Sequence, residues 1–277
     1  MLGSDSSHYR DDYGYLTVHA TSCEFWGGSI GGYVVGSYLT NCLMDRVLGG
    51  SVAGLPGNEW TLRNCTWRGG QFYMDRWWSP IPVSVRDCAF DDVTISVDDG
   101  QGATDYDYNA YLTNATRLDA GATHDVLLAT NSFNFQSGPL GYFYLPTNGP
   151  ATNLFNKGST SATNVGLYHF TCTANQWKET NSIVDIGFHR VALNSSGLPV
   201  DTDGDGLPDY FEDRNGNGSW DIGESKWKTT GSGDPTDTDG DGVGDFLEFL
   251  LGRNPYAAGT TNDATGTLNL RRYTPLK

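Results

Sequence analysis

Basic side chains are scarce in this sequence. Its 277 residues include 17 Lys and Arg against 33 Asp and Glu, which gives a formal net charge of −16. A protein that binds nucleic acid needs a basic face to contact the phosphates. We therefore expect no nucleic acid among its partners.

Long apolar runs are also missing. No stretch approaches the roughly 20 consecutive apolar residues of a transmembrane helix, so we expect no membrane span. Residues 1–8 (MLGSDSSH) have neither the basic region nor the apolar core of a signal peptide. We expect the chain to be the C-terminal part of a longer bacterial protein, with its export signal in the missing N-terminal part. Its expected location is extracellular or at the cell surface.

Glycine and aromatic residues are plentiful instead. The chain has 36 Gly, and 13% of its residues are Phe, Trp or Tyr. This aromatic content is too high for a disordered chain, and this glycine content is too high for a helical bundle. The composition favours a loop-rich β protein.

A repeat occupies the first hundred residues. Four cysteines, at positions 23, 42, 65 and 88, are separated by 19, 23 and 23 residues. A small polar residue precedes each cysteine, and a large apolar residue follows two positions later. A period of about 20 residues is typical of solenoids, and at roughly 3.3 Å per strand residue it fits one coil of three short strands. The units are Ser22-Cys23-Glu-Phe25, Asn41-Cys42-Leu-Met44, Asn64-Cys65-Thr-Trp67 and Asp87-Cys88-Ala-Phe90.

The polar residue before each cysteine predicts a bend. Each cysteine also has an apolar residue three positions before it. Side chains alternate between the two faces of a strand, so one continuous strand could not point both of these residues into the core. Asn and Asp tolerate the left-handed backbone that such a bend requires. We expect the cysteines to be buried and reduced. Stacked coils would place them about 4.7–4.9 Å apart, whereas the Cβ atoms of a disulfide are about 3.8 Å apart.

These units resemble the right-handed parallel β-helix of pectate-lyase-like bacterial surface proteins. The resemblance covers roughly residues 14–192 and extends to residues 107–111 (DYNAY). Residues 149–153 (GPATN) and 184–189 (VDIGFH) look like the closing coils of that family. The resemblance implies an all-β fold, with a right-handed parallel β-helix solenoid and its closing region over residues 1–192.

The acidic residues are concentrated after a run of turn-forming residues at 194–199 (NSSGLP). Residues 201–253 contain 14 acidic and 4 basic side chains, a net charge of 4 − 14 = −10. We place a domain boundary at this run, with a small loop-rich calcium-binding tail over residues 193–255. Residues 256–277 form a C-terminal tail without a functional signal.

Three twelve-residue segments of this tail have the spacing of a calcium-binding loop. Each has oxygen-bearing side chains at positions 1, 3, 5, 9 and 12, with Gly at position 6, where the loop must turn sharply. Position 7 contributes its backbone carbonyl, and Glu at position 12 can supply two oxygens. The predicted Ca²⁺ ligands are Asp201, Asp203, Asp205, Leu207, Asp209 and Glu212 in loop one; Asp213, Asn215, Asn217, Ser219, Asp221 and Glu224 in loop two; and Asp237, Asp239, Asp241, Val243, Asp245 and Glu248 in loop three.

The three loops follow a register of twelve residues. In loop two, Asn215 and Asn217 replace two carboxylates, so we expect weaker Ca²⁺ binding there. Loops one and two are adjacent, which leaves no room for the helix that an EF-hand has on each side of its loop. The register resembles thrombospondin type 3 calcium repeats, whose bacterial versions end like residues 246–255 here, where we expect one or two helical turns. Dockerins, in which a helix follows each loop, are the alternative.

The sequence therefore predicts a calcium-binding, extracellular or cell-surface β-helix protein with a structural, adhesive or glycan-binding role. Ca²⁺ would stiffen the tail into a spacer or anchor. The alternative is a carbohydrate-active enzyme, a polysaccharide lyase or a glycoside hydrolase, that uses a face of the β-helix. No catalytic residue is assigned. The carboxylates and aromatic side chains considered for sugar chemistry are Asp91 with Asp92, Asp98 with Asp99, Asp105 with Asp107, and Trp77 with Trp78.

Overall fold

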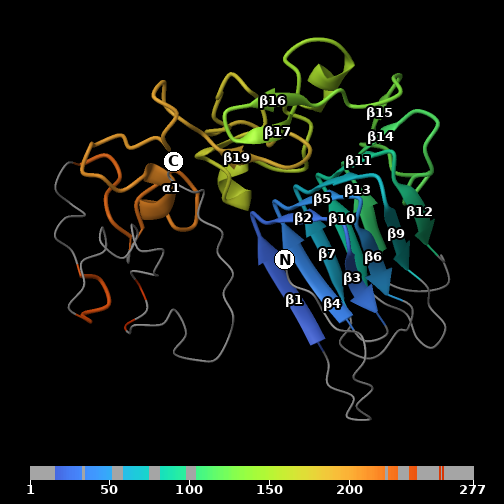
Figure 1. The fold of residues 1–277 in the computed structure, drawn as a ribbon, viewed down its shortest axis with the longest axis horizontal. Helices are drawn as coiled ribbons and strands as arrows, with labels where there is room; N and C mark the ends of the chain where they lie inside the picture. Colours follow the sequence, from blue (N-terminus) through green and yellow to red (C-terminus); the bar gives the residue numbers. More distant parts are fainter. Residues whose placement is uncertain are drawn as a thin grey trace.

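The chain folds into an all-β solenoid of parallel sheets with almost no helix (Figure 1). The computed structural model describes residues 16–32, 35–51, 59–74, 82–97, 104–221, 224–229 and 237–241, together with Tyr256 and Ala258. Successive coils contribute strands to three sheets, A, B and C, in which each strand pairs in parallel with its counterpart in the next coil. The prediction of a parallel β-solenoid is confirmed.

The three sheets have five, six and four strands. Sheet A contains β1 (Leu16–Thr21), β4 (Val35–Thr40), β7 (Trp60–Arg63), β10 (Val83–Arg86) and β13 (Thr104–Asp107). Sheet B contains β2 (Glu24–Trp26), β5 (Leu43–Asp45), β8 (Thr66–Arg68), β11 (Ala89–Asp91), β14 (Ala110–Leu112) and β15 (Val126–Leu128). Sheet C contains β3 (Ser29–Gly32), β6 (Leu48–Ser51), β9 (Gln71–Met74) and β12 (Thr94–Val97).

The bend between sheets A and B lies at the polar residue before each cysteine, as the sequence predicted. The backbone there has a φ angle between 49° and 59°, a left-handed conformation that Asn and Asp adopt more readily than most residues. The bend changes the parity of the side chains, so that residues on both sides of it face the interior. The bend residues are Ser22 (53°), Asn41 (49°), Asn64 (50°) and Asp87 (59°).

The cysteines after these bends form a ladder along the solenoid. The backbone N–H of Cys42 donates to Cys65 Sγ at 3.4 Å, and the N–H of Cys65 donates to Cys88 Sγ at 3.4 Å. Asn109 continues the ladder in the next coil, where its Oδ1 accepts from the Cys88 N–H at 3.0 Å. Residues 107–111, to which the sequence resemblance extends, belong to this coil; here an amide oxygen replaces the sulfur, and Tyr108 (φ 61°) replaces the polar bend residue.

Large aromatic side chains fill the rest of the interior. Trp60, Trp67, Phe72 and Phe90 are almost completely buried. The rings of Phe72 and Phe90, which come from successive coils, meet edge to face, with their centroids 6.3 Å apart. Because burial of apolar surface is the main favourable contribution to folding, these stacked rings hold successive coils together.

The burial of the cysteines predicts how they react. All five are free thiols; Cys23 is half-buried, whereas Cys42, Cys65, Cys88 and Cys172 are buried. Burial raises the pKa of the Cys65 thiol well above its usual value. Because the thiolate is the reactive species, we expect a thiol reagent to modify Cys23 alone in the native protein and all five cysteines after unfolding. Timed labelling with mass spectrometry of the peptides measures this, and rapid native labelling of Cys65 would contradict the buried ladder.

Residues 129–193, the covering segment, lie against the outer face of sheet B (Figure 1). Side chains that sheet B turns outward, such as Leu43 and Ala89, share one apolar cluster with Phe133 and Ile186. The covering segment thus buries an apolar face of the solenoid. Its elements are β16 (Gln136–Gly138), β17 (Gly141–Tyr144), the 3-10 helices η1 (Pro150–Leu154) and η2 (Ala162–Val165), β18 (Phe170–Thr171) and β19 (Arg190–Val191).

Part of the covering segment crosses successive coils near their bends. Asn41 Nδ2 donates to the His189 carbonyl (2.9 Å), and Asn41 Oδ1 accepts from the His189 N–H (2.7 Å). Two coils further on, the Asp87 carbonyl accepts from the Gly187 N–H (2.9 Å). The N–H of Phe188 bonds a threonine hydroxyl in the coil between them (2.9 Å). Residues 187–189, termed the brace, therefore connect three successive coils.

Residues 149–153 and 184–189, which were predicted as closing coils, do not continue the ladders of the solenoid. The parallel ladder of sheet B ends at β15. The first segment instead lies mostly in η1, and the second contains the brace. The physical reason is that their apolar side chains pack against the apolar outer face of sheet B. These segments cover the side of the solenoid.

Helical structure is limited to single turns. Besides η1 and η2, the described residues contain one α-helix, the four-residue α1 (Asp209–Glu212). Among the described residues, no helix has the length and apolar character needed to cross a lipid bilayer.

Candidate metal site in the acidic loops

Loop one, residues 201–212, is a compact turn held by its own carboxylates. Asp201, at position 1, accepts from the N–H groups of Gly204 (Oδ1, 2.7 Å) and Gly206 (Oδ2, 3.1 Å). Both glycines have positive φ angles, 75° and 102°, which glycine adopts without steric cost. The carboxylates at positions 3 and 5 each use Oδ1 to accept from the N–H two residues further on, at 3.2 and 3.0 Å.

The other carboxylate oxygens of loop one converge. Asp201, Asp203 and Asp205 each offer an oxygen within 4.8 Å of the other two. Glu212, at position 12, is not part of this converging group. It is completely buried, and neither of its oxygens has a hydrogen-bond partner of normal geometry among the described residues. Oδ2 of Asp205 is also buried and has no hydrogen-bond partner of normal geometry among the described residues. Buried polar atoms in proteins are normally paired, so these oxygens indicate a ligand.

The ionisation of Glu212 reflects this crowding. Burial raises the pKa of Glu212 to about 8. The nearby Ser225 hydroxyl opposes the rise, whereas the charges of Asp205, Asp203 and Asp209 add to it. Without a cation, Glu212 therefore keeps its proton at neutral pH, which limits the repulsion among the four carboxylates.

Asp209, at position 9, closes the loop instead of joining the converging group. Its Oδ1 accepts from the Thr202 N–H and its Oδ2 from the Thr202 hydroxyl, both at 2.6 Å. Asp209 is fully buried, and its Oδ2 lies 3.7 Å from His169 Nδ1 and 3.8 Å from Lys178 Nζ. Leu207, at position 7, buries its side chain. Asp209 thus connects loop one to the covering segment.

Loop two, residues 213–224, has the same type of turn but a different interior. Oδ1 of Asn215 and Oδ1 of Asn217 accept from the N–H two residues further on, at 3.0 and 2.7 Å, as the carboxylates of loop one do. The inward atom is then the amide nitrogen. Both amides donate to Oδ2 of Asp221, at 2.8 and 2.7 Å. Amide N–H groups therefore occupy the position that oxygens occupy in loop one.

The other side chains predicted as ligands in loop two also bond to protein groups. Asp213 accepts from two backbone N–H groups of the loop, and Glu224 accepts from two others. The N–H of Ser219 donates to an asparagine of the loop. The described residues of loop two form no group of converging carboxylates like those of loops one and three.

Loop three is described over residues 237–241. Asp237, Asp239 and Asp241 offer oxygens within 4.8 Å of one another. Asp237 Oδ1 accepts from the Gly240 N–H (2.8 Å) and Asp239 Oδ1 from the Asp241 N–H (3.1 Å), as positions 1 and 3 do in loop one. The remaining predicted ligands of this loop, Val243, Asp245 and Glu248, lie outside the described residues, as does the helix expected over residues 246–255.

A buried histidine that no motif indicated anchors the first two loops. His169 Nε2 lies 2.9 Å from Asp213 Oδ2, and the ring of Trp227 packs edge-on against His169 at 4.8 Å. The neighbouring Tyr168 N–H donates to the Gly216 carbonyl at 3.0 Å. His169 and Asp213 are 44 residues apart in the sequence, so only the folded structure could reveal this contact.

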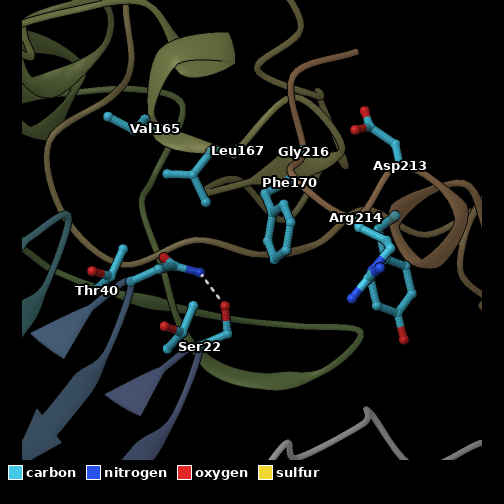
Figure 2. A pocket seen from close by; sticks show the side chains of 12 residues that line it. Ser22, Thr40, Val165, Leu167, Phe170, Asp213, Arg214 and Gly216 are labelled. Carbon is cyan, nitrogen blue, oxygen red and sulfur yellow. Dashed lines mark hydrogen bonds between the residues drawn. The ribbon is translucent and has the colours of Figure 1, made fainter. Parts of the chain in front are cut away.

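Figure 2 shows the junction of loops one and two beside the solenoid. A cavity of about 130 Å³ separates Asp213 and Arg214 from Ser22 and Thr40, which lie at the bends of the first coils. Phe170, from the covering segment, also lines this cavity. The loops are therefore held at the side of the solenoid, next to the covering segment.

Several carboxylates considered for catalysis have structural partners. Asp91 is buried and accepts from the Ser132 hydroxyl (3.2 Å) and the Phe133 N–H (3.4 Å), so it helps to hold the covering segment. Asp92 occupies a bend with a φ angle of 57°. The other residues considered for sugar chemistry that lie outside the described residues are Asp98, Asp99, Trp77 and Trp78.

Asp105 and Asp107 lie on the outer face of sheet A. Asp105 forms an ion pair with Arg86 (2.6 Å), and Asp107 Oδ2 lies 2.7 Å from His124 Nδ1. The register places Arg63, Arg86 and Asp107 side by side in neighbouring strands. This face therefore combines carboxylate, imidazole and guanidinium groups in one area.

No known protein family matches this chain. Comparisons with curated proteins and with solved structures also gave no match. The resemblance to pectate-lyase-like β-helices and to thrombospondin type 3 repeats therefore rests on the repeated motifs alone. The fold and the arrangement of the loops rest on the structure.

Proposed function

We propose that the protein binds calcium ions through loops one and three. The observation that carries the proposal is Glu212, a completely buried carboxylate whose oxygens have no hydrogen bond of normal geometry among the described residues, close to the charges of Asp203 and Asp205. The available donors are all oxygens, the ligand type that Ca²⁺ prefers. Ca²⁺ also accepts six to eight such ligands in irregular geometry, whereas Mg²⁺ requires a near-octahedral arrangement and keeps several waters.

Loop two is the weakest of the three candidate sites. Before Asn215 and Asn217 can present oxygens to a cation, both amides must rotate. That rotation removes their hydrogen bonds to Asp221 and to the backbone. Neutral amides also attract a cation less than carboxylates do. We expect Ca²⁺ to occupy loop two only after the other loops.

Calcium would order the connection between the solenoid and the tail. Asp209 and His169 join loops one and two to the covering segment, so a cation that gathers the carboxylates of loop one also fixes its docking. The tail would then serve as a calcium-stiffened spacer or anchor. The solenoid is inferred to be right-handed, because nearly all parallel β crossovers are right-handed.

An extracellular or cell-surface location suits this chemistry. Highly charged loops of this kind match the weak affinities, about 10⁻⁴–10⁻³ M, of extracellular calcium modules. The solenoid then has a structural, adhesive or glycan-binding role, and the loops set the stiffness of its connection to the tail.

Calorimetric titration of the whole, metal-free chain with Ca²⁺ tests the proposal. We expect two ions to bind with dissociation constants of about 10⁻⁴–10⁻³ M and a third more weakly, with residues 193–255 becoming resistant to protease as the ions bind. In the double variant Asn215→Asp, Asn217→Asp the third ion should bind more tightly, because two carboxylates replace two amides. The other two ions serve as the internal control. Absence of binding at millimolar Ca²⁺ would overturn the proposal.

A second candidate function is carbohydrate-active chemistry on sheet A. It is favoured by the presence of Asp107, His124 and two arginines on one outer face, because lyases and hydrolases need acid–base groups at the sugar. Release of reducing ends or unsaturated sugars from a panel of polysaccharides, lost in Asp107→Asn, would support it. Binding without release would instead indicate a glycan-binding role.

A further inference from the structure

Four buried side chains of the covering segment, none of them from the acidic loops, meet at one point. Cys172, Glu179, Asp185 and His189 are at most 8% exposed. Each offers a ligand atom within 4.8 Å of the other three. They belong to the chain between β18 and β19, and they bring one sulfur, one nitrogen and two carboxylate oxygens together in the protein interior.

In the histidine and in both carboxylates, the polar atom that points away from the cluster is hydrogen-bonded to another protein group. Outer contacts of this kind orient the ligands in metal sites. The remaining atoms, Nε2, Oδ2 and Oε1, face one another together with the cysteine sulfur. The outer contacts join His189 Nδ1 to the Gly187 carbonyl (2.9 Å), Asp185 Oδ1 to the Asn156 N–H (2.7 Å), and Glu179 Oε2 to the Ser182 hydroxyl (2.8 Å).

The inward atoms need positive charge between them. Because His189 Nδ1 faces a carbonyl oxygen, it carries a proton, and the lone pair of a neutral ring then points from Nε2 to Glu179 Oε1, 2.9 Å away. Cys172 Sγ lies 2.9 Å from Asp185 Oδ2, whereas the thiol–carbonyl contacts elsewhere in the solenoid are 3.1–3.4 Å long. Each pair of electron-rich atoms must share a proton, or all four must share one metal ion.

We propose that these four residues bind a transition-metal dication, and that Zn²⁺ is the ion that fits them best. Zn²⁺ takes four tetrahedral ligands from cysteine, histidine and carboxylate side chains. Sulfur and imidazole nitrogen make the set unsuitable for Ca²⁺, which takes oxygen ligands. Because the protein supplies all four ligands, the site is of the structural kind. Binding releases the thiol proton of Cys172.

The metal would hold the brace in position. His189 is a proposed ligand, and its backbone makes both hydrogen bonds to Asn41. Cys172 directly follows β18, and His189 directly precedes β19. One ion would therefore tie together the two ends of the chain between these strands and fix it against sheet B.

Cobalt serves as a spectroscopic probe of this site. The full chain is produced in cobalt-supplemented medium, because a buried site takes up metal most readily as the chain folds, and it is then kept in saturating Ca²⁺. We expect a thiolate-to-cobalt charge-transfer band, which added Zn²⁺ removes. In Cys172→Ser the band should be absent and the zinc affinity should fall more than about tenfold. Cys23→Ser, which changes a cysteine outside the site, is the matched control and should retain both.

Thermal melting provides a second readout that does not depend on the colour of cobalt. Zn²⁺ should raise the melting temperature of the wild type and of Cys23→Ser, but not of Cys172→Ser. A wild-type protein without the thiolate band, or a band that persists in Cys172→Ser, would show that the four residues share protons and bind no metal. Calcium binding is measured separately, so the two proposals can fail independently.

Discussion

Replacing Glu212 by glutamine is expected to weaken calcium binding at loop one by roughly 10- to 100-fold or more. Loss of an outer-shell partner already weakens a metal site by roughly 10- to 100-fold, and Glu212 is a proposed direct ligand. Each tenfold loss corresponds to about 1.4 kcal/mol. Glutamine has nearly the same shape, but it is neutral and supplies one oxygen where glutamate can supply two. Calorimetry of E212Q measures the effect. Loop three is the internal control, and its ion should bind with the same affinity as in the wild type.

The pKa of Glu212 also predicts how stability varies with pH. Without Ca²⁺, the folded chain keeps the Glu212 proton up to about pH 8, whereas the unfolded chain loses it near the usual value of 4.5. The stabilising contribution of this group is therefore complete below pH 4.5 and is lost as the pH rises to about 8. Ca²⁺ displaces the proton, so its affinity should increase over the same range.

Thermal melts of the metal-free wild type and of E212Q, from about pH 5 to about pH 8, separate this effect from others. Asp125 and Asp185 also have pKa values raised to about 6, mainly by burial, and they contribute to both proteins. The difference between the two proteins should therefore report Glu212 alone. Identical pH profiles would contradict the prediction, because glutamine does not titrate.

Replacing Asn41 by alanine is expected to lower the free energy of unfolding by about 3–8 kcal/mol. The change removes both side-chain hydrogen bonds to His189 and leaves a buried N–H and a buried carbonyl unpaired, at about 1–3 kcal/mol each. Alanine is also less tolerant of the left-handed conformation, where φ is 49°, by about 1–2 kcal/mol. Urea-induced unfolding of the variant measures the loss.

Two further variants distinguish the lost hydrogen bonds from the backbone effect. Asn41→Gly loses the same bonds without the steric penalty, so it should be less destabilised than Asn41→Ala. Asn64→Ala has a similar φ angle, 50°, but it loses one long bond of 3.4 Å to the Asp185 carbonyl. If Asn41→Ala and Asn64→Ala lose equal stability, the brace contributes nothing beyond the bend.

The solenoid could be predicted from the sequence because its signal is local. Each coil repeats a bend residue, a cysteine and a large apolar residue within a few positions, and stacking follows from that periodicity. The covering segment has no such signal, because its bonds join residues as distant as Asn41 and His189, 148 positions apart. The sequence resemblance included residues 107–111, but it could not show that the Asn109 amide oxygen takes the place of a cysteine sulfur in the ladder.

The acidic loops show where spacing determines structure and where it does not. The carboxylates at positions 1, 3 and 5 converge in loops one and three because the turn fixes which side chains point inward. The bonds of Asp209 to Thr202, and of the loop two amides to Asp221, depend on side-chain rotation. The contact of His169 with Asp213 depends on how the covering segment folds.

Under tension applied at its N-terminal end, a solenoid unwinds one coil at a time, because each coil contacts only its neighbours. Here the first coil, β1 to β3, is joined to the covering segment by the ion pair between Glu24 and Arg190, and it would detach first. The next three coils are cross-linked by the brace, so they must rupture together. The coils held by the brace, from Asn41 to Asp87, would therefore bear force as one stiff unit, whereas the coil of β1 to β3 would yield early.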